Sequence, residues 1–235
     1  MRRRTFLGAS GMAVTGIAGC LGGDNGETAA NEYGYETTTS DGTEVPLVPI
    51  EDAIEWYDDD ETVFVDTRDR TAFDRARIAG SVFSPAPDGQ ETDDPMGEYD
   101  EERRIVTYCV CPHYLAGLRG ASLIRAGYAH TYALDEGFEP WVEGGHPVEG
   151  DAVDSRPPVY EIRGSTAPEH ADEYAWARHE PTGQREAVPI RADGSFTLHL
   201  RFHDIDRAST IEVQTPGGST TAPLGALTED TLDLR

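Results

Sequence analysis

The chain has 235 residues, of which 44 are Asp or Glu and 19 are Arg, with no Lys, so its formal net charge is −25. This charge excludes nucleic-acid binding driven by counterion release, and 37% apolar residues argue against a disordered chain and for one or two folded domains. Because charges are screened within about 3 Å in molar salt, the lysine-free, acidic composition predicts a halophilic protein rather than an acidic secreted protein of ordinary salinity.

Residues 1–19 are predicted to be an export signal. Residues 2–7 (RRRTFL) resemble the twin-arginine motif, and the weakly apolar stretch that follows is too short to span a hydrocarbon core of about 30 Å. Residues 17–20 (IAGC) resemble a lipobox, which implies that Cys20 becomes the lipid-modified first residue of the mature chain. The alternative is a stray Cys in a discarded peptide. We expect an exported lipoprotein, anchored to the outer face of the cell membrane.

Residues 20–43 are rich in Gly, Thr, Glu and Asn and show no apolar periodicity. Such a segment buries too little apolar surface to fold by itself. We expect a flexible acidic linker that holds the folded part away from the membrane.

Residues 44–150 alternate between helix and strand signals. Apolar runs predict buried strands, and apolar residues spaced three or four apart predict helices between them. The pattern favours an α/β domain with a mostly parallel sheet that helices cover on both faces. The predicted strands are 62–66, 105–108 and 131–134, and the predicted helical segments are 50–57, 73–78, 115–126 and 138–142.

Cys109 directly follows the apolar strand that ends at Tyr108. In an open α/β sheet, ligands bind beyond the carboxyl ends of the strands. Pro112 suits the first turn of the next helix, so backbone N–H groups are expected to point toward Cys109 and to favour its thiolate. The structural alternative is a buried Cys that packs as a small apolar side chain.

Three stretches resemble signatures of the rhodanese-like superfamily. Residues 64–68 (FVDTR) and 76–81 (ARIAGS) are similar to its Asp-x-Arg strand and its Gly-His-Ile-Pro-Gly-Ala motif. Residues 134–147 resemble its closing Leu-x-Gly-Gly-Phe-x-x-Trp-x-x-x-Gly-x-Pro motif. The resemblance implies that Cys109 accepts a sulfane sulfur as a persulfide and passes it to a nucleophilic acceptor, with no cofactor.

The loop after Cys109 departs from the usual Cys-x-x-Gly-x-Arg pattern of that superfamily and resembles its Cys-x-Cys-Pro variant. The position of the Arg is taken by Tyr114, which argues against the related Cys-x5-Arg phosphatases, since a guanidinium holds phosphoryl oxygens in two-point contact. The candidate loop or substrate-binding residues are Val110, Cys111, Pro112, His113, Tyr114 and Arg119.

Four charged or titratable side chains near this loop are candidates for a supporting role, and two of them have an alternative interpretation. Arg119 either lies on a solvated helix face, which we favour, or clamps substrate. His113 either lowers the thiol pKa as a nearby cation or is exposed at the helix start. Asp66 and Arg68 are expected to organise the loop from the neighbouring strand rather than to touch substrate.

Cys111 has three interpretations. A metal site with Cys109 and His113 is disfavoured, because no second Cys pair completes a tetrahedral set. A disulfide to Cys109 would be strained, since one residue separates the two. As a resolving thiol, Cys111 attacks a persulfide on Cys109 and releases sulfide. We expect a minor resolving role or none, and no metal.

Residues 157–235 are predicted to form a small all-β, β-sandwich-like domain. Residues 196–203 alternate strictly, with the aromatic and Leu side chains on an inner face, and Asp193-Gly194 is a hairpin signal. His199, Arg201 and His203 share the outer face, where exposed polar residues are favoured over a metal site. This part is expected to be a spacer or to bind a protein partner.

Two functions from different classes remain. One is a sulfurtransferase that acts on a small sulfur-containing substrate at the outer face of the membrane. The other is a catalytically silent rhodanese-fold module that binds a partner or a small sulfur anion.

Overall fold

The computed structural model describes residues 30–59, 61–90, 92–110 and 113–235. The predicted export signal and Cys20 lie outside these residues, as do Cys111 and Pro112 in the cysteine loop. No helix in the described part of the chain has the length and apolar character needed to cross a membrane.

The described residues include a six-stranded sheet with the order β1-β2-β7-β6-β3-β5. The pair β1/β2 is antiparallel, whereas each of the other neighbouring pairs is parallel. The sheet is therefore mixed and mostly parallel, as predicted. Its strands are β1 (Thr37–Ser40), β2 (Thr43–Val48), β3 (Thr62–Asp66), β5 (Val82–Phe83), β6 (Arg104–Tyr108) and β7 (Thr131–Leu134).

Helices cover both faces of this sheet. Successive strand residues point to opposite sides, so each face presents apolar side chains to a helix. On one face, Phe64, Val106 and Tyr132 pack in one cluster with Trp56 of α1 and Trp141 of α4. On the other face, α3 packs against β2, β6 and β7. The helices are α1 (Ile50–Asp58), α3 (Tyr114–Arg125) and α4 (Phe138–Glu143).

The helical turn predicted over 73–78 ends earlier than expected. Asp69 is the N-cap of helix α2 (Arg70–Arg75), and its carboxylate accepts a hydrogen bond from the Ala72 N–H. The backbone is already in an extended conformation at Ala76. The Ile78 N–H donates to the hydroxyl of Tyr108 instead of continuing the helix. Residues Arg77–Ile78 form β4, which pairs with β8 (Val148–Glu149). Further along the chain, η1 (Pro95–Glu98) is a short 3-10 helix.

The prediction of a flexible linker is wrong for residues 37–43. Strand β1 and the start of β2 form a hairpin there, with Asp41 and Gly42 both at positive φ in its turn. Asp-Gly is a strong hairpin signal, and composition alone does not show it. Just before the hairpin, the Tyr35 ring lies 6.1 Å from the Trp56 ring, centroid to centroid, so this segment packs against α1.

The C-terminal β region (residues 157–235) has two mainly antiparallel sheets that share one apolar core, with the orders β11-β10-β13-β14 and β12-β9-β15. As predicted, Phe196, Leu198, Leu200 and Phe202 are buried in that core. The strand itself ends at Leu200, earlier than expected. The elements are β9 (Tyr160–Ser165), η2 (Pro168–His170), β10 (Tyr174–His179), β11 (Gln184–Pro189), β12 (Ser195–Leu200), β13 (Thr210–Thr215), β14 (Gly218–Pro223), α5 (Leu224–Leu227) and β15 (Leu232–Asp233).

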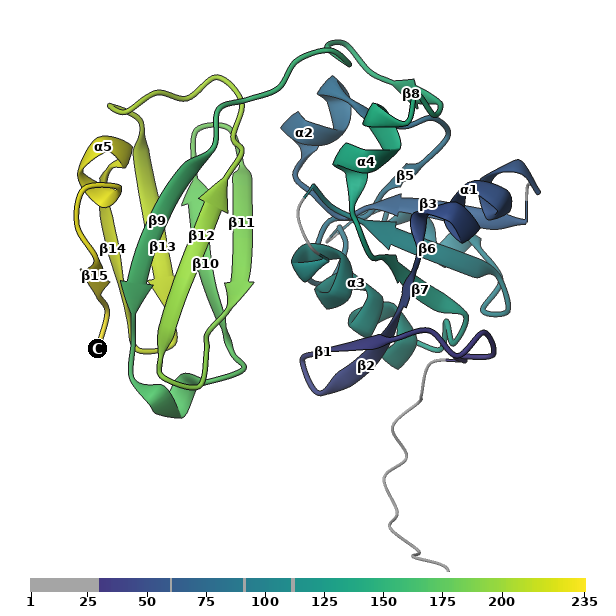
Figure 1. Cartoon of the computed structure of the whole chain (residues 1–235), viewed down its shortest axis with the longest axis horizontal. Helices are drawn as coiled ribbons and strands as arrows, with labels where there is room; N and C mark the ends of the chain where they lie inside the picture. Colours follow the sequence, from purple (N-terminus) through teal and green to yellow (C-terminus); the bar gives the residue numbers. More distant parts are fainter. Residues whose placement is uncertain (1–29, 60, 91, 111–112) are drawn as a thin grey trace, which may run out of the picture.

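The C-terminal β region packs beside α2 and α3 of the α/β part, with β11 in contact with both helices (Figure 1). Ala187 of β11 joins the apolar cluster around α3, and Trp176 of β10 packs against the same cluster. At the edges of this contact, the Tyr174 hydroxyl donates to Ser40 Oγ at 3.2 Å, and Arg75 pairs with Asp204. This packing covers the end of the sheet at which the candidate site lies.

Candidate functional site

Cys109 lies immediately beyond β6, a central strand between β3 and β7, as predicted. Its carbonyl oxygen accepts a hydrogen bond from the Phe138 N–H at 2.9 Å. Gly137 makes this approach possible: its φ is +76°, and a Cβ there would lie 2.9 Å from the Cys109 carbonyl oxygen. The closing motif at 134–147 therefore fixes the backbone of the cysteine.

The thiol of Cys109 is in an environment that disfavours the thiolate. Burial first, and then the nearby carboxylate of Glu186, raise the pKa of Cys109 to about 12. The backbone N–H groups of Ala116 and Leu115 at the start of α3 act in the opposite direction, as the sequence suggested, but they are outweighed. The expectation of a stabilised thiolate is therefore wrong for this conformation.

The C-terminal β region contributes to this environment. Cys109 is only 2% exposed and packs in one apolar cluster with Leu115 and Ala187. Glu186 is also buried, and its Oε1 accepts a hydrogen bond from the Ala187 N–H at 2.9 Å. Sequence reasoning missed Glu186, because no local pattern shows that β11 docks onto a loop 77 residues earlier.

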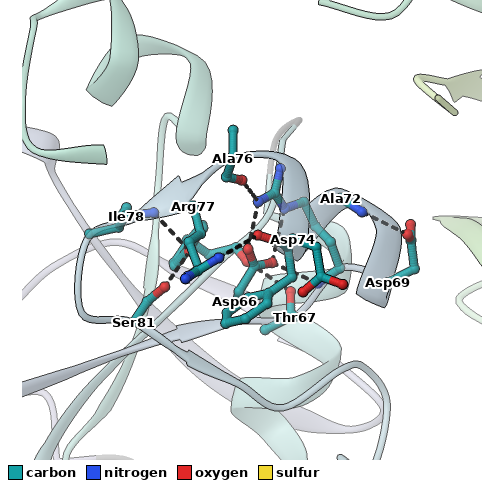
Figure 2. A network of polar contacts seen from close by, with 12 residues as sticks. Asp66, Thr67, Asp69, Ala72, Asp74, Ala76, Arg77, Ile78 and Ser81 are labelled. Atoms are coloured by element: carbon teal, nitrogen blue, oxygen red, sulfur yellow. Dashed lines mark hydrogen bonds and ion pairs between the residues drawn. The ribbon is translucent and has the colours of Figure 1, made fainter. Parts of the chain in front are cut away.

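Asp66 and Arg68 form a buried ion pair, and the Arg68 guanidinium is near enough to Cys109 to act on its thiol electrostatically. Figure 2 shows the network of polar contacts around Asp66. Asp66 accepts hydrogen bonds from the Arg68 backbone N–H, Nε and Nη2 at 3.0, 2.9 and 2.5 Å. The same Nη2 donates to the Ala76 carbonyl at 2.6 Å. The guanidinium also lies over the Phe138 ring, 4.6 Å from its centroid, so the pair links β3 to the residue that holds Cys109.

We expect Asp66→Ala to lower the free energy of unfolding by about 3–5 kcal/mol, because it leaves the Arg68 guanidinium buried without its carboxylate. Denaturant titration measures the change. The control is Asp74→Ala, which removes an exposed i,i+4 partner of Arg70 and should cost about 0.5 kcal/mol or less. Equal losses in the two variants would contradict the assigned role.

The described part of the cysteine loop resumes at the start of α3. His113 caps the helix in the left-handed region, at φ 35°, and its Nδ1 lies 3.4 Å from Asp135 Oδ1. Tyr114 packs against the core of the C-terminal β region. This position therefore contributes to the contact between the two parts of the chain.

The expectation that Arg119 lies on a solvated helix face is wrong, because its side chain is buried. It is 4% exposed, its Nη2 contacts Asp94 Oδ2 at 2.6 Å, and its Nε donates to Ser84 Oγ at 2.9 Å. The helix face that carries Arg119 is covered by the segment that contains Asp94. Because the Asp94 carboxylate already engages the guanidinium, Arg119 fastens that segment to α3.

Residues 50–144 match the family model of the rhodanese-like domain. Among solved structures, the chain is 24% identical to a Bacillus halodurans protein, covering 44% of this chain and 76% of that one, with a TM-score of 0.36. A rhodanese-like domain from Anabaena sp. is 23% identical, with coverages of 48% and 84% and a TM-score of 0.38. A Rhodopseudomonas palustris protein of unknown function, titled a possible tyrosine phosphatase, is 21% identical, with coverages of 45% and 85% and a TM-score of 0.38.

Proposed function

We propose that the rhodanese-like domain at residues 50–144 is a sulfurtransferase that carries sulfane sulfur on Cys109. The observation that carries the proposal is the position of Cys109, beyond a central parallel strand and facing the N–H groups of Leu115 and Ala116 at the start of α3. Those N–H groups stabilise negative charge on a sulfur atom. They are suited to a thiolate and equally to the terminal sulfur of a persulfide.

The proposed reaction has two displacements and no net redox change. The Cys109 thiolate attacks the outer sulfur of a persulfide or thiosulfate donor, forming a sulfur–sulfur bond and releasing the donor's thiolate or sulfite. A nucleophilic acceptor then attacks the outer sulfur of the Cys109 persulfide, and the Cys109 thiolate leaves. No metal or organic cofactor is needed to balance either step.

Reaction at Cys109 requires the edge of β11 to move away from the thiol. In the closed arrangement the thiol is buried and its pKa is about 12, so both access and ionisation are suppressed. Displacement of Ala187 and Glu186 would relieve both at once. We propose that the C-terminal β region opens during turnover.

The same burial favours a second candidate, a catalytically silent rhodanese-fold module. A thiol that stays covered packs as a small apolar side chain, and Tyr114 in place of Arg leaves the loop without its usual cation. In that case the α/β part serves as a binding module for a partner or a small sulfur anion.

Sulfur transfer by the intact chain separates the two candidates. The assay supplies thiosulfate or an alkyl persulfide as donor and cyanide as acceptor, and measures thiocyanate. Turnover above the protein-free rate supports the sulfurtransferase. Correctly folded protein that fails with both donors supports the silent module.

We also propose that the protein is salt-adapted, exported and held at the outer face of the membrane by lipid on Cys20. The support is sequence alone: residues 2–7 and 17–20, with the acidic, lysine-free composition. Cys20→Ser in the full chain is expected to move the protein from the membrane fraction to the soluble extracellular fraction. Retention of the variant on membranes after a high-salt wash would contradict lipid anchoring.

A further inference from the structure

A small crevice lies between the two parts of the chain, next to the cysteine loop. Its volume is about 50 Å³, several times the roughly 10–15 Å³ that one water molecule requires. Val110, which follows Cys109, lines it together with Phe138. The crevice therefore has room for a ligand of a few heavy atoms.

The polar lining of this crevice is mainly cationic. Arg68 comes from the α/β part, Arg156 from the connecting segment, and Arg201 and His203 from the C-terminal β region, with Glu139 as the carboxylate among the lining residues. The chain has 44 acidic residues and 19 basic ones, so a lining with more basic than acidic side chains differs from the chain as a whole. A lining of this kind favours an anionic ligand.

The local ion pairs leave part of this positive charge available. Arg68 is balanced by Asp66, and Arg201 Nε lies 3.3 Å from Glu139 Oε1. Arg156, in contrast, donates its Nη1 to the backbone carbonyls of Val153 and Ser155, and the described part of the chain gives it no carboxylate partner.

The side chain of His203 belongs to the same lining but adds little fixed charge. Burial, and then the nearby guanidinium groups of Arg75 and Arg68, lower its pKa, while Asp204 acts in the opposite direction. A neutral imidazole still offers one N–H donor. The sequence had placed Arg201 and His203 on an exposed sheet face, but beyond the end of β12 both lie against the α/β part, half-buried.

We propose that this crevice binds a small, doubly charged oxyanion through Arg156 and Arg201 while the two parts of the chain are in contact. Planar guanidinium groups donate two parallel hydrogen bonds to such oxygens. Because both parts of the chain line the crevice, the anion is bound in the closed arrangement, and its binding does not depend on the proposed function.

Calorimetric titration of the intact chain with sulfate, which does not react with thiols, tests the proposal at fixed KCl concentration. We expect saturable 1:1 binding, weaker binding of singly charged nitrate, and a loss of about tenfold or more in Arg156→Gln and in Arg201→Gln. Arg201→Lys should keep part of the affinity, which distinguishes lost charge from lost fold. Arg163→Gln, an exposed substitution on β9, should bind like the wild type.

Cys109→Ser should bind sulfate normally, so a failed sulfur-transfer assay and a failed binding assay remain separate results. No saturable sulfate binding would overturn the proposal. Binding that persists unchanged in both Arg→Gln variants would also overturn it, since the anion would then occupy another place.

Discussion

Cys109→Ser is expected to reduce sulfur transfer to the protein-free rate, a loss on the order of 10³-fold or more, because a hydroxyl cannot form the persulfide. Cys111→Ser should at most weaken turnover, since neither displacement of the proposed reaction uses its thiol. Steady-state thiocyanate formation from an alkyl persulfide measures both variants. The side-chain change is the same in each, so Cys111→Ser is the matched control.

Two outcomes of this comparison would contradict the assignment. If Cys111→Ser were the inactive variant and Cys109→Ser retained turnover, the nucleophile would be the other thiol. If both variants kept wild-type rates, the measured transfer would not proceed through the loop. Tyr114 leads us to expect faster turnover with a neutral or singly charged persulfide than with thiosulfate.

Glu186→Gln is expected to lower the pKa of Cys109 and to speed its alkylation by iodoacetamide. The Glu186 carboxylate is the second contributor to the raised pKa, after burial, so removing its charge favours the thiolate. Below the pKa, the rate follows the thiolate fraction, and each unit of lowering gives about a tenfold gain. The alkylation rate of the variant should therefore level off at a lower pH than that of the wild type.

Glu180→Gln is the control for this experiment, because it removes the same charge from an exposed position in the turn before β11. It should leave the rate–pH profile of Cys109 unchanged. Peptide mapping assigns the alkylation to Cys109 and separates it from Cys111. Identical profiles for Glu186→Gln and the wild type would contradict the influence of Glu186 on the thiol.

The α/β architecture could be predicted because its signals are local. The runs at 62–66 and 105–108 are continuous and apolar, as expected of strands covered on both faces, and they form β3 and β6. The position of Cys109 follows from the same signal, since a residue after a central parallel strand lies at the ligand-binding edge. The parallel pairing of β3 with β6 sets Asp66 opposite Tyr108, which brings Asp66 and Arg68 close to Cys109.

Features that arise from packing between distant segments could not be predicted. Arg119 was expected on a solvated face because helical spacing does not reveal the Asp94 segment that covers it. We predicted a lowered pKa for Cys109, and this direction was wrong. The helix N–H groups that lower the pKa can be predicted from the sequence, whereas the burial and the Glu186 carboxylate that raise it cannot. Arg201 was likewise expected on an exposed sheet face, because the sequence does not show that the end of β12 packs against the α/β part.

Mass spectrometry of the intact chain after treatment with a persulfide donor tests the central claim most directly. A gain of about 32 Da, the mass of one sulfur atom, located on Cys109 and removed by cyanide, is the result we predict. Its absence from folded protein with every donor tried, or its location only on Cys111, would contradict sulfur transfer through Cys109.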